Sequence, residues 1–337
     1  MNLSTPGPCR WPGKKDSSGW KVKITSSRMA TSCTFASMSE KKPFLQPSKR
    51  AMIVLPIGLA AISFAAILIK VCDAPPLVIA AYRLSLATLF LLLFTLPRTI
   101  GEFRQMGRQE ILASTLAGVF LCFHFALWIT SLKYTSVASS VIFVTTNPIF
   151  VALASTFLLR EKISATLFLS ISIAVLGGII IAWGDLGQGK ENLYGNFLAL
   201  LGAIMATGYL LVGRRVRQQM GLMAYITLVY GVAAILLIFL ALISGNSLFN
   251  YTPKTYLIFF LLALFPQLIG HTTLNWALKF FSATLVAVLI LGEPIGATIL
   301  AFLLLKEPLT KKLLFGGTLV LLGIYFSARE ERKLGKL

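Results

Sequence analysis

The sequence predicts an all-α integral membrane protein with ten transmembrane helices, arranged as two inverted repeats of five helices each. Three observations lead to this fold class. Hydrophobic residues make up 56% of the 337 residues and charged residues only 13%, and the mean hydropathy is +0.81. Ten apolar segments follow one another after residue 50. The two halves of the chain also match each other at a fixed offset.

The composition excludes several classes of protein. A soluble domain carries about 25% charged residues, and this chain has half that share, so it cannot cover a globule of its size with polar side chains. A soluble enzyme, a disordered chain and a disulfide-stapled secreted domain are therefore excluded. The four cysteines include no CxxC pair and have no spacing typical of a metal site or a disulfide framework. We expect no cofactor and no metal.

Residues 1–50 are predicted to be a disordered basic leader. They hold 13 Ser or Thr, ten Lys or Arg and two acidic residues, a composition typical of an organellar transit peptide. A second interpretation is a mis-assigned start, because Met29 and Met38 could each begin the chain. The first interpretation predicts a plastid envelope location, and the second predicts the cell membrane.

Ten segments after the leader are long and apolar enough to span a bilayer, which takes about 20 residues. They cover approximately residues 51–70, 75–96, 109–131, 135–159, 163–183, 193–213, 222–243, 254–275, 281–305 and 309–327. The short loops between them make sequential helices antiparallel. The predicted organisation is a first repeat at 51–183, a loop at 184–192, a second repeat at 193–328 and a basic cytoplasmic tail at 329–337.

The positions of Lys and Arg predict the orientation. The loops on the side of the N-terminus hold 13 of them besides the ten in the leader, and the loops on the other side hold seven. Because cytoplasmic loops are enriched in Lys and Arg, we expect both termini in the cytoplasm. The last outer loop, with three lysines, does not fit this rule.

The two halves match at an offset of 146 residues. One lysine, one proline and one glutamate recur at identical spacing, as Lys133, Pro148 and Glu161 and again as Lys279, Pro294 and Glu307. Such matches at one fixed offset indicate an internal duplication. Because each half has five spans, the second enters the membrane from the opposite side. Inverted repeats are typical of secondary transporters, whose substrate site lies near the midplane between the repeats.

The chain resembles the EamA type of the drug/metabolite transporter superfamily over about residues 52–328. The motifs that carry the resemblance are FAAILIK ending at Lys70, Ala74-Pro75-Pro76, Tyr82-Arg83, WITSLKYTSVASS, NWALKFFSAT and the two Pro-x12-Glu helices. The resemblance implies ten transmembrane helices, a central cavity and the transport of small metabolites.

Two charged residues inside the predicted spans are the main candidates for substrate binding or proton coupling, because intramembrane charge is costly. Glu293 lies roughly 18 Å from the inner end of its helix, and Arg83 about 12 Å from an outer end, at 1.5 Å per residue. Glu293 could bind an ammonium group or carry a proton, or be a protonated link between helices. Arg83 could bind a carboxylate or phosphate, or pair with Glu293. The repeat mate of Glu293 is Asn147.

Further polar and aromatic residues are candidates for the cavity wall. We expect His124 toward the outer side and His271 toward the inner side, either as proton-relaying groups or as interhelical hydrogen-bond donors. The other candidates are Trp128, Tyr209, Asn275 and Gln267. Pro148 and Pro294 each remove a backbone donor and are expected to kink their helices. Lys70, Glu161 and Glu307 lie at helix ends and are expected to form gate-side or interfacial pairs.

The function predicted from these observations is secondary active transport of small metabolites, such as amino acids, by alternating access and in the export direction. The expected partners are a small-molecule substrate and the lipid bilayer, with proton coupling and a homodimer left open and nucleic acid excluded. The alternatives are an organellar exchanger of sugar phosphates or nucleotide sugars, a channel, and an intramembrane enzyme. The sequence has no HExxH, GxSxG or P-loop motif, which disfavours an enzyme.

Overall fold

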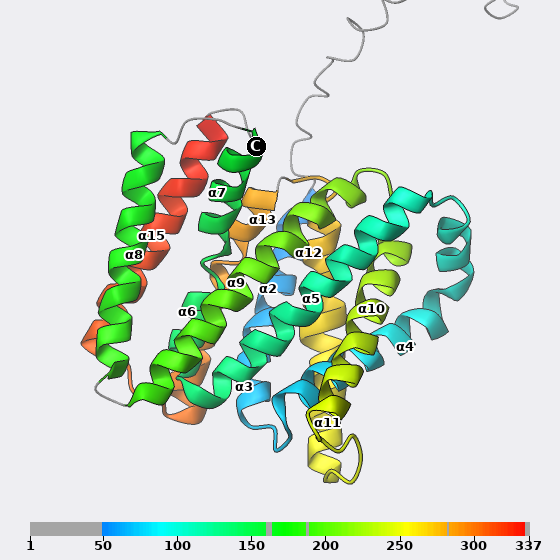
Figure 1. Cartoon of the computed structure of the whole chain (residues 1–337), viewed down its shortest axis with the longest axis horizontal. Coiled ribbons are helices and arrows are strands. Elements are labelled where there is room, and N and C mark those ends of the chain that lie inside the picture. The colour runs from blue at the N-terminus through cyan, green and yellow to red at the C-terminus, as the bar shows by residue number, and fades with distance from the viewer. Residues whose placement is uncertain (1–48, 160–163, 187–188, 282, 334–337) are drawn as a thin grey trace, which may run out of the picture. The chain divides into compact units, whose positions relative to one another are not determined.

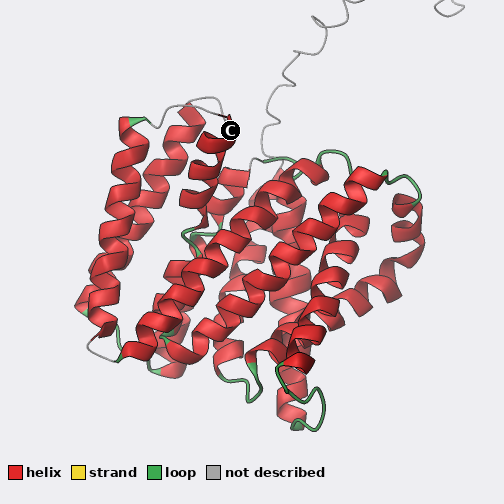
Figure 2. Ribbon diagram, in the orientation of Figure 1, coloured by secondary structure: helices red, strands yellow, loops and turns green. Residues whose placement is uncertain are grey.

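The computed structural model describes residues 49–159, 164–186, 189–281 and 283–333 (Figure 1). The described residues form helices joined by short loops, and no strand occurs among them (Figure 2). The predicted leader, apart from its last two residues, and the predicted site residue Glu161 lie outside the described residues.

The first half of the chain folds into five helical passages, two of which are interrupted. Its helices are α2 (Lys49–Ser63), α3 (Ala65–Lys70), α4 (Pro76–Phe103), α5 (Arg108–Tyr134), α6 (Val137–Val144), α7 (Asn147–Leu159) and α8 (Ala165–Leu186). α2 and α3 form the first passage, and α6 and α7 form the fourth.

The second half repeats this order of five passages. Its helices are α9 (Lys190–Arg217), α10 (Leu222–Ile243), α11 (Pro253–Leu262), η2 (Ala263–His271), α12 (Thr272–Ala277), α13 (Ala283–Leu289), α14 (Gly292–Leu300), η3 (Ala301–Leu305) and α15 (Lys311–Lys333). The segments η2 and η3 are π-helical, a form that is common at functional sites.

Six helices among the described residues are long and apolar enough to cross a membrane. They are Ile53–Lys70, Pro76–Phe103, Arg108–Tyr134, Lys190–Arg217, Leu222–Ile243 and Pro253–Ala277. Three shorter apolar helices accompany them, at Val137–Val151, Phe168–Ile181 and Gly292–Leu305. The sequence therefore correctly predicted a multi-span helical membrane protein, while the described helices supply six clear spans.

The fourth and ninth passages are both interrupted near their middle. α6 ends at Val144 and α7 begins at Asn147, directly before Pro148. In the ninth passage α13 ends at Leu289, and α14 begins at Gly292, two residues before Pro294. Proline suits the first turn of a helix because its missing N–H has no intrahelical acceptor there. Both prolines thus start a new helix segment.

Several helices extend beyond their predicted ends. α4 continues to Phe103 although it contains Pro97, α8 reaches Leu186, and α9 starts at Lys190. The predicted loop at 184–192 and the start of the predicted tail at 329 are therefore partly helical, since α15 continues to Lys333. The charged residues at these helix ends were assigned to loops in the sequence analysis. A transmembrane helix can, however, continue through polar turns beyond the hydrocarbon region of the bilayer.

α8 and α15 pack side by side along their length (Figure 1). The close approach depends on glycine: a Cβ atom on Gly177 would stand 2.5 Å from the carbonyl oxygen of Gly316, and one on Gly316 would stand 2.6 Å from that of Gly177. Small residues allow this approach between membrane helices. The pair has its own small apolar core, which includes Ile181 and Val320.

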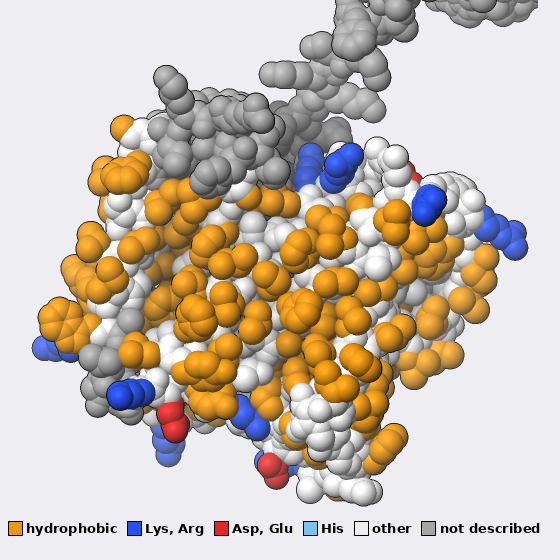
Figure 3. Space-filling model, viewed as in Figure 1, with side chains coloured by type: hydrophobic (Ala, Val, Ile, Leu, Met, Phe, Trp, Pro, Cys, Tyr) orange, Lys and Arg blue, Asp and Glu red, His pale blue; other side chains and the backbone are white. Residues whose placement is uncertain are grey.

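Apolar side chains cover the middle of the face that Figure 3 shows, and Lys and Arg side chains gather toward its two ends. Large apolar side chains are strongly exposed on the surface of the protein. The exposed fraction is 76% for Phe94, 69% for Trp183 and 68% for Phe168. An apolar belt bounded by charge is the surface expected for a protein that sits in a bilayer.

Candidate functional site

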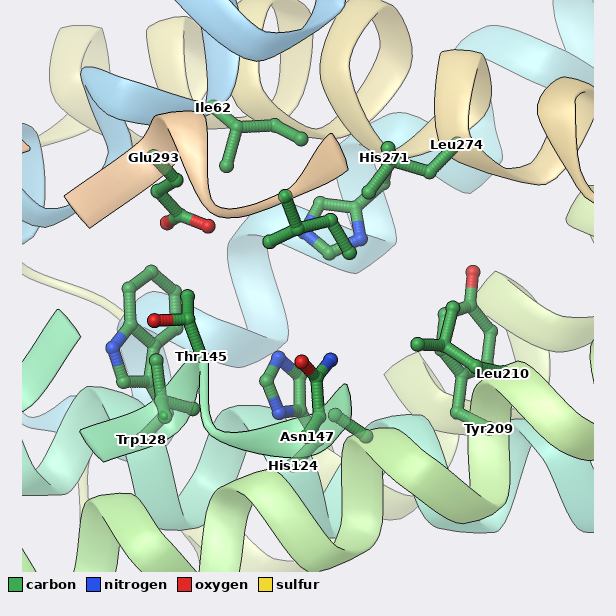
Figure 4. A pocket seen from close by; sticks show the side chains of 13 residues that line it. Ile62, His124, Trp128, Thr145, Asn147, Tyr209, Leu210, His271, Leu274 and Glu293 are labelled. Atoms are coloured by element: carbon green, nitrogen blue, oxygen red, sulfur yellow. The ribbon is translucent and has the colours of Figure 1, made fainter. Parts of the chain in front are cut away.

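A small cavity lies between the two halves of the chain, and Figure 4 shows the side chains that line it. The volume that the centres of water molecules can occupy in this cavity is about 40 Å³. Six of the nine predicted binding or coupling residues line it, namely His124, Trp128, Asn147, Tyr209, His271 and Glu293. All six are buried, with at most 9% of their surface exposed.

The two helix interruptions each present a polar residue to the cavity. Glu293 lies in the first turn of α14 and Asn147 begins α7. The two side chains extend into the cavity from opposite walls (Figure 4). The positive end of the helix dipole favours a carboxylate in a first turn. The cavity therefore holds one acid and one amide at equivalent positions of the predicted repeats.

Both histidines line this same cavity. Nδ1 of His124 lies 3.0 Å from the carbonyl oxygen of Gly202. The ring of Phe125 lies between the two histidines, with its centroid 4.9 Å from that of His124 and 5.2 Å from that of His271.

Arg83 is completely buried, but it does not line the cavity directly. Its Nε donates a 2.8 Å hydrogen bond to Oε1 of Gln267, and its guanidinium carbon lies 4.2 Å above the ring of Phe125. In the part of the chain that the structure describes, no ion pair within 4.0 Å joins Arg83 to Glu293, although the two charges attract each other. The predicted alternative of a direct pair is not formed.

Asn275 also lies behind the cavity and positions one of its walls. It accepts a 2.6 Å hydrogen bond from the hydroxyl of Tyr209, and its Nδ2 donates to the hydroxyl of Tyr230 at 3.1 Å and to the carbonyl oxygen of His271 at 2.9 Å. Because all of these groups are buried, the network fixes the position of the Tyr209 ring.

Sequence reasoning missed two residues of the site. Tyr230 belongs to the network of Asn275, but it stands among apolar residues of α10 and gave no signal of its own. Thr145 lines the cavity two residues before Asn147. The run Thr145-Thr146-Asn147-Pro148 could have indicated it, since consecutive hydroxyl residues before a proline are typical of an interrupted helix.

Several buried polar atoms around the cavity have no hydrogen-bond partner among the described residues. They are Nη1 and Nη2 of Arg83, Nε1 of Trp128, Oδ1 of Asn147, Nε2 of Gln267 and Nδ1 of His271. Buried polar groups are nearly always paired in proteins, so these atoms are available to water or to a ligand. Together with the carboxylate of Glu293 they offer both donors and acceptors to a ligand.

Lys70 and Glu307 lie far from the cavity, at one end of the bundle. Nζ of Lys70 donates to the carbonyl oxygens of Leu132 at 2.7 Å and Thr135 at 2.9 Å. Glu307 accepts a 2.9 Å hydrogen bond from the backbone N–H of Val137. Burial raises the pKa of the Glu307 carboxyl, and the charge of Lys70 and the bond from Val137 oppose this shift.

Among the described residues, no group of three or more His, Cys, Asp or Glu side chains is placed to hold a metal ion.

Comparison with known proteins identifies the family. The sequence profile of the EamA-like transporter family matches the chain twice, over residues 50–183 and 193–329. The chain is 28% identical to the uncharacterized transporter YdfC of Bacillus subtilis over 286 residues, which are 84% of this chain and 92% of that protein. It is 27% identical to an uncharacterized transporter of Archaeoglobus fulgidus over 285 residues, 84% of this chain and 99% of the relative.

A solved crystal structure shares the fold. It matches with a TM-score of 0.61 and 17% sequence identity, over 85% of this chain and 98% of the other. The repeated profile match covers most of the chain, and its apolar helices are those of a membrane protein. The chain belongs to the EamA-like transporter family, within the drug/metabolite transporter superfamily.

Proposed function

We propose that this membrane protein is a secondary active transporter that carries small zwitterionic metabolites, such as amino acids, by alternating access. The observation that carries the proposal is the set of unpaired buried polar groups around one cavity between the two halves. A zwitterion presents a carboxylate to donors and an ammonium group to acceptors, and so matches both kinds of group in that set.

The ammonium group would bind on the side of Glu293 and Asn147. The carboxylate of Glu293 and Oδ1 of Asn147 are both acceptors, and both side chains extend into the cavity (Figure 4). The carboxylate group of the ligand would bind toward Nε1 of Trp128 and Nδ1 of His271, with Arg83 as the nearby cation. Buried charges are tolerated when they are paired, and such a ligand pairs both Glu293 and Arg83.

The size of the cavity favours a mechanism with moving walls. Ligand pockets usually measure about 300–1,000 Å³, and this cavity offers only about 40 Å³ to water. A metabolite can enter only after helices separate. The interruptions before Asn147 and Glu293 supply hinges for that movement, because interrupted backbone lacks the helical hydrogen bonds that stiffen a continuous helix.

The proposal includes ten membrane passes in two inverted repeats. Each matched half contains five helical passages in the described residues. Thr135, beside the end of α3, contacts Gly195 near the start of α9, so the first passages of the two halves run in opposite directions. The distribution of Lys and Arg supports cytoplasmic termini in a cell membrane. A plastid envelope, with the leader as transit peptide, is the alternative location.

Export, proton coupling through Glu293 and association into a homodimer complete the proposal. A carboxylate that is buried without a close cation is suited to bind a proton, since burial disfavours its charged form.

The runner-up function is an exchanger of phosphorylated compounds, and the two unpaired nitrogens of Arg83 favour it. The acid in the cavity disfavours a phosphate dianion, because like charges repel there.

A thermal-shift screen of the purified protein tests the substrate class. A ligand that binds only the folded protein raises the unfolding temperature. Amino acids should raise the unfolding temperature of the parent protein, and most of this increase should be lost in Glu293→Gln. The control is Glu191→Gln, which alters an exposed glutamate at the start of α9. This variant should respond like the parent. Stabilisation by sugar phosphates alone, unaffected by Glu293→Gln, would contradict the proposal and support the exchanger.

A further inference from the structure

The same contact occurs once in each half of the chain. In the first half Lys70, at the end of the first passage, donates to the carbonyl oxygen of Leu132 at 2.7 Å. In the second half Arg214, near the end of the first passage, donates to the carbonyl oxygen of Leu278 at 2.6 Å. Leu132 and Leu278 are 146 residues apart, which is the offset of the duplication. Each cation therefore binds the last turn of the third passage of its own half.

The two contacts lie at opposite ends of the bundle. α9 starts beside the Lys70 contact, where Gly195 meets Thr135, and Arg214 lies near its other end. The 19 residues between Gly195 and Arg214 correspond to about 28 Å of helix. A cation at a helix C-terminus satisfies carbonyl groups that lack intrahelical partners, so both contacts are favourable and both are made in this structure.

The contact at the Lys70 end also joins the two halves. Glu307 follows η3 in the second half, and its carboxylate accepts from the N–H of Val137, the first residue of α6 in the first half. Among the described residues no ion pair within 4.0 Å joins Lys70 to Glu307. Lys70 ties the end of α3 to the end of α5, and Glu307 ties the end of η3 to the start of α6.

These ends belong to the passages whose interruptions line the cavity. α6 runs from Val137 to the interruption at Thr145, and α14 with η3 runs from Glu293 toward Glu307. α6 packs against α14, and the partner segments α7 and α13 pack against each other. Both passages thus run from the Lys70 end to the cavity wall, and Glu307 ties them together at their outer ends.

We propose that Lys70 and Glu307 form a clasp that keeps the cavity closed at their end of the bundle, and that the Arg214 contact closes the opposite end. The inference rests on the proposed transport, since only a transporter needs to open each end in turn. Both contacts are made in this structure, in which the polar residues of the cavity wall are buried. Release of one clasp would open one side only.

Cysteine accessibility in sealed proteoliposomes tests this proposal. Cys9, Cys33, Cys72 and Cys122 are first replaced, and Ala206→Cys then supplies a single reporter thiol in the cavity wall. Ser247→Cys and Gln219→Cys, in separate samples, supply reference thiols at the Lys70 end and the Arg214 end. A membrane-impermeant thiol reagent is added on one side at a time, and the labelling rate of the reporter thiol is measured without any substrate.

Loss of one charge-assisted hydrogen bond is expected to increase labelling about tenfold. Glu307→Ala and Lys70→Met should each produce this increase from the Lys70 end and none from the other end. Arg214→Met should produce it from the Arg214 end only. Glu307→Gln keeps an oxygen acceptor for Val137 and removes the buried charge, so it should label no faster than the parent. Glu191→Gln controls for the loss of one acidic charge at the same end.

Two results would overturn the clasp. One is parental labelling in both Glu307→Ala and Lys70→Met, with size-exclusion profiles that show folded protein. The other is increased labelling from both ends, or from the Arg214 end, in either variant. The assay is independent of the substrate: one-sided opening in a protein that transports no amino acid would refute the proposed function and leave the clasp intact, whereas amino-acid transport with parental labelling would refute the clasp alone.

Discussion

The hydroxyl of Tyr209 donates a 2.6 Å hydrogen bond to Oδ1 of Asn275 and so joins α9 to α12 beside the cavity. Asn275 donates in turn to Tyr230 on α10. The first of these residues lines the cavity and the other two lie behind it. A change in the cavity can therefore reach three helices of the second half through two hydrogen bonds.

Tyr209→Phe should destabilise the protein by about 1–2 kcal/mol, because it leaves a buried acceptor on Asn275 without its donor. The unfolding temperature in detergent should fall accordingly. Tyr325→Phe, which alters a tyrosine that is 50% exposed on α15, is the matched control and should leave the temperature unchanged. Equal unfolding temperatures for the two variants would mean that the network does not stabilise the fold.

Arg83→Lys should weaken the binding of carboxylate ligands about tenfold, because a lysine keeps the charge but loses the planar array of donors. The unpaired nitrogens Nη1 and Nη2 of Arg83 are the groups concerned. Isothermal titration with an amino acid and with the corresponding amine, which lacks the carboxylate, measures the effect. If both ligands weaken equally, Arg83 does not act on the carboxylate.

Gly177→Val should destabilise the protein by about 1–3 kcal/mol or more, since an added side chain would overpack a tight interface. The new Cβ would stand 2.5 Å from the carbonyl oxygen of Gly316. Gly101→Val is the control, because no atom lies within 4 Å of a Cβ at that position. Unfolding in detergent should separate the two variants, and a Gly177→Val protein as stable as the control would contradict this packing.

The clasp at Glu307 should become tighter as the pH falls. Burial raises the pKa of Glu307 in the closed clasp, with Lys70 as the charged side chain that opposes the shift. When the clasp opens, the carboxyl faces water and its pKa returns to about 4.3. A group whose pKa is higher in the closed form binds protons more readily in that form, so acid favours closure. This stabilisation of the closed form is lost as the pH rises through the raised pKa.

Labelling of the Ala206→Cys reporter from the Lys70 end measures this effect. It is divided by the labelling of the Ser247→Cys reference at the same pH, which removes the pH dependence of the thiol itself. The ratio should fall on acidification in the parent background. It should stay flat in Glu307→Gln, which cannot titrate. A ratio that rises in acid would show that protonation opens the clasp.

Apolar length, short loops and the repeat were enough to predict a multi-span helical protein. Six of the candidate residues chosen from the sequence line one cavity in the structure. Glu293, Asn147 and Trp128 could be found because polar or aromatic groups stand out within apolar segments. Their meeting point followed from the duplication, which puts equivalent residues on either side of the same interface.

Other features depend on tertiary contacts that one sequence does not encode locally. Tyr230 looks like an ordinary packing residue until Asn275 is seen to bond with it. The contact that His124 and His271 share with the ring of Phe125 likewise depends on tertiary packing. Arg214 lies two residues away from the exact repeat mate of Lys70, so its equivalent role became visible only through the carbonyl of Leu278.

Counterflow of an amino acid in proteoliposomes tests the central claim most directly. Vesicles loaded with an unlabelled amino acid should take up the labelled compound transiently above its external concentration, because one carrier exposes the same site to each side in turn. Glu293→Gln should abolish this overshoot while its protein inserts and purifies normally, and Glu191→Gln should retain it. Absence of any overshoot in the parent protein across a panel of amino acids, or an undiminished overshoot in Glu293→Gln, would contradict the account.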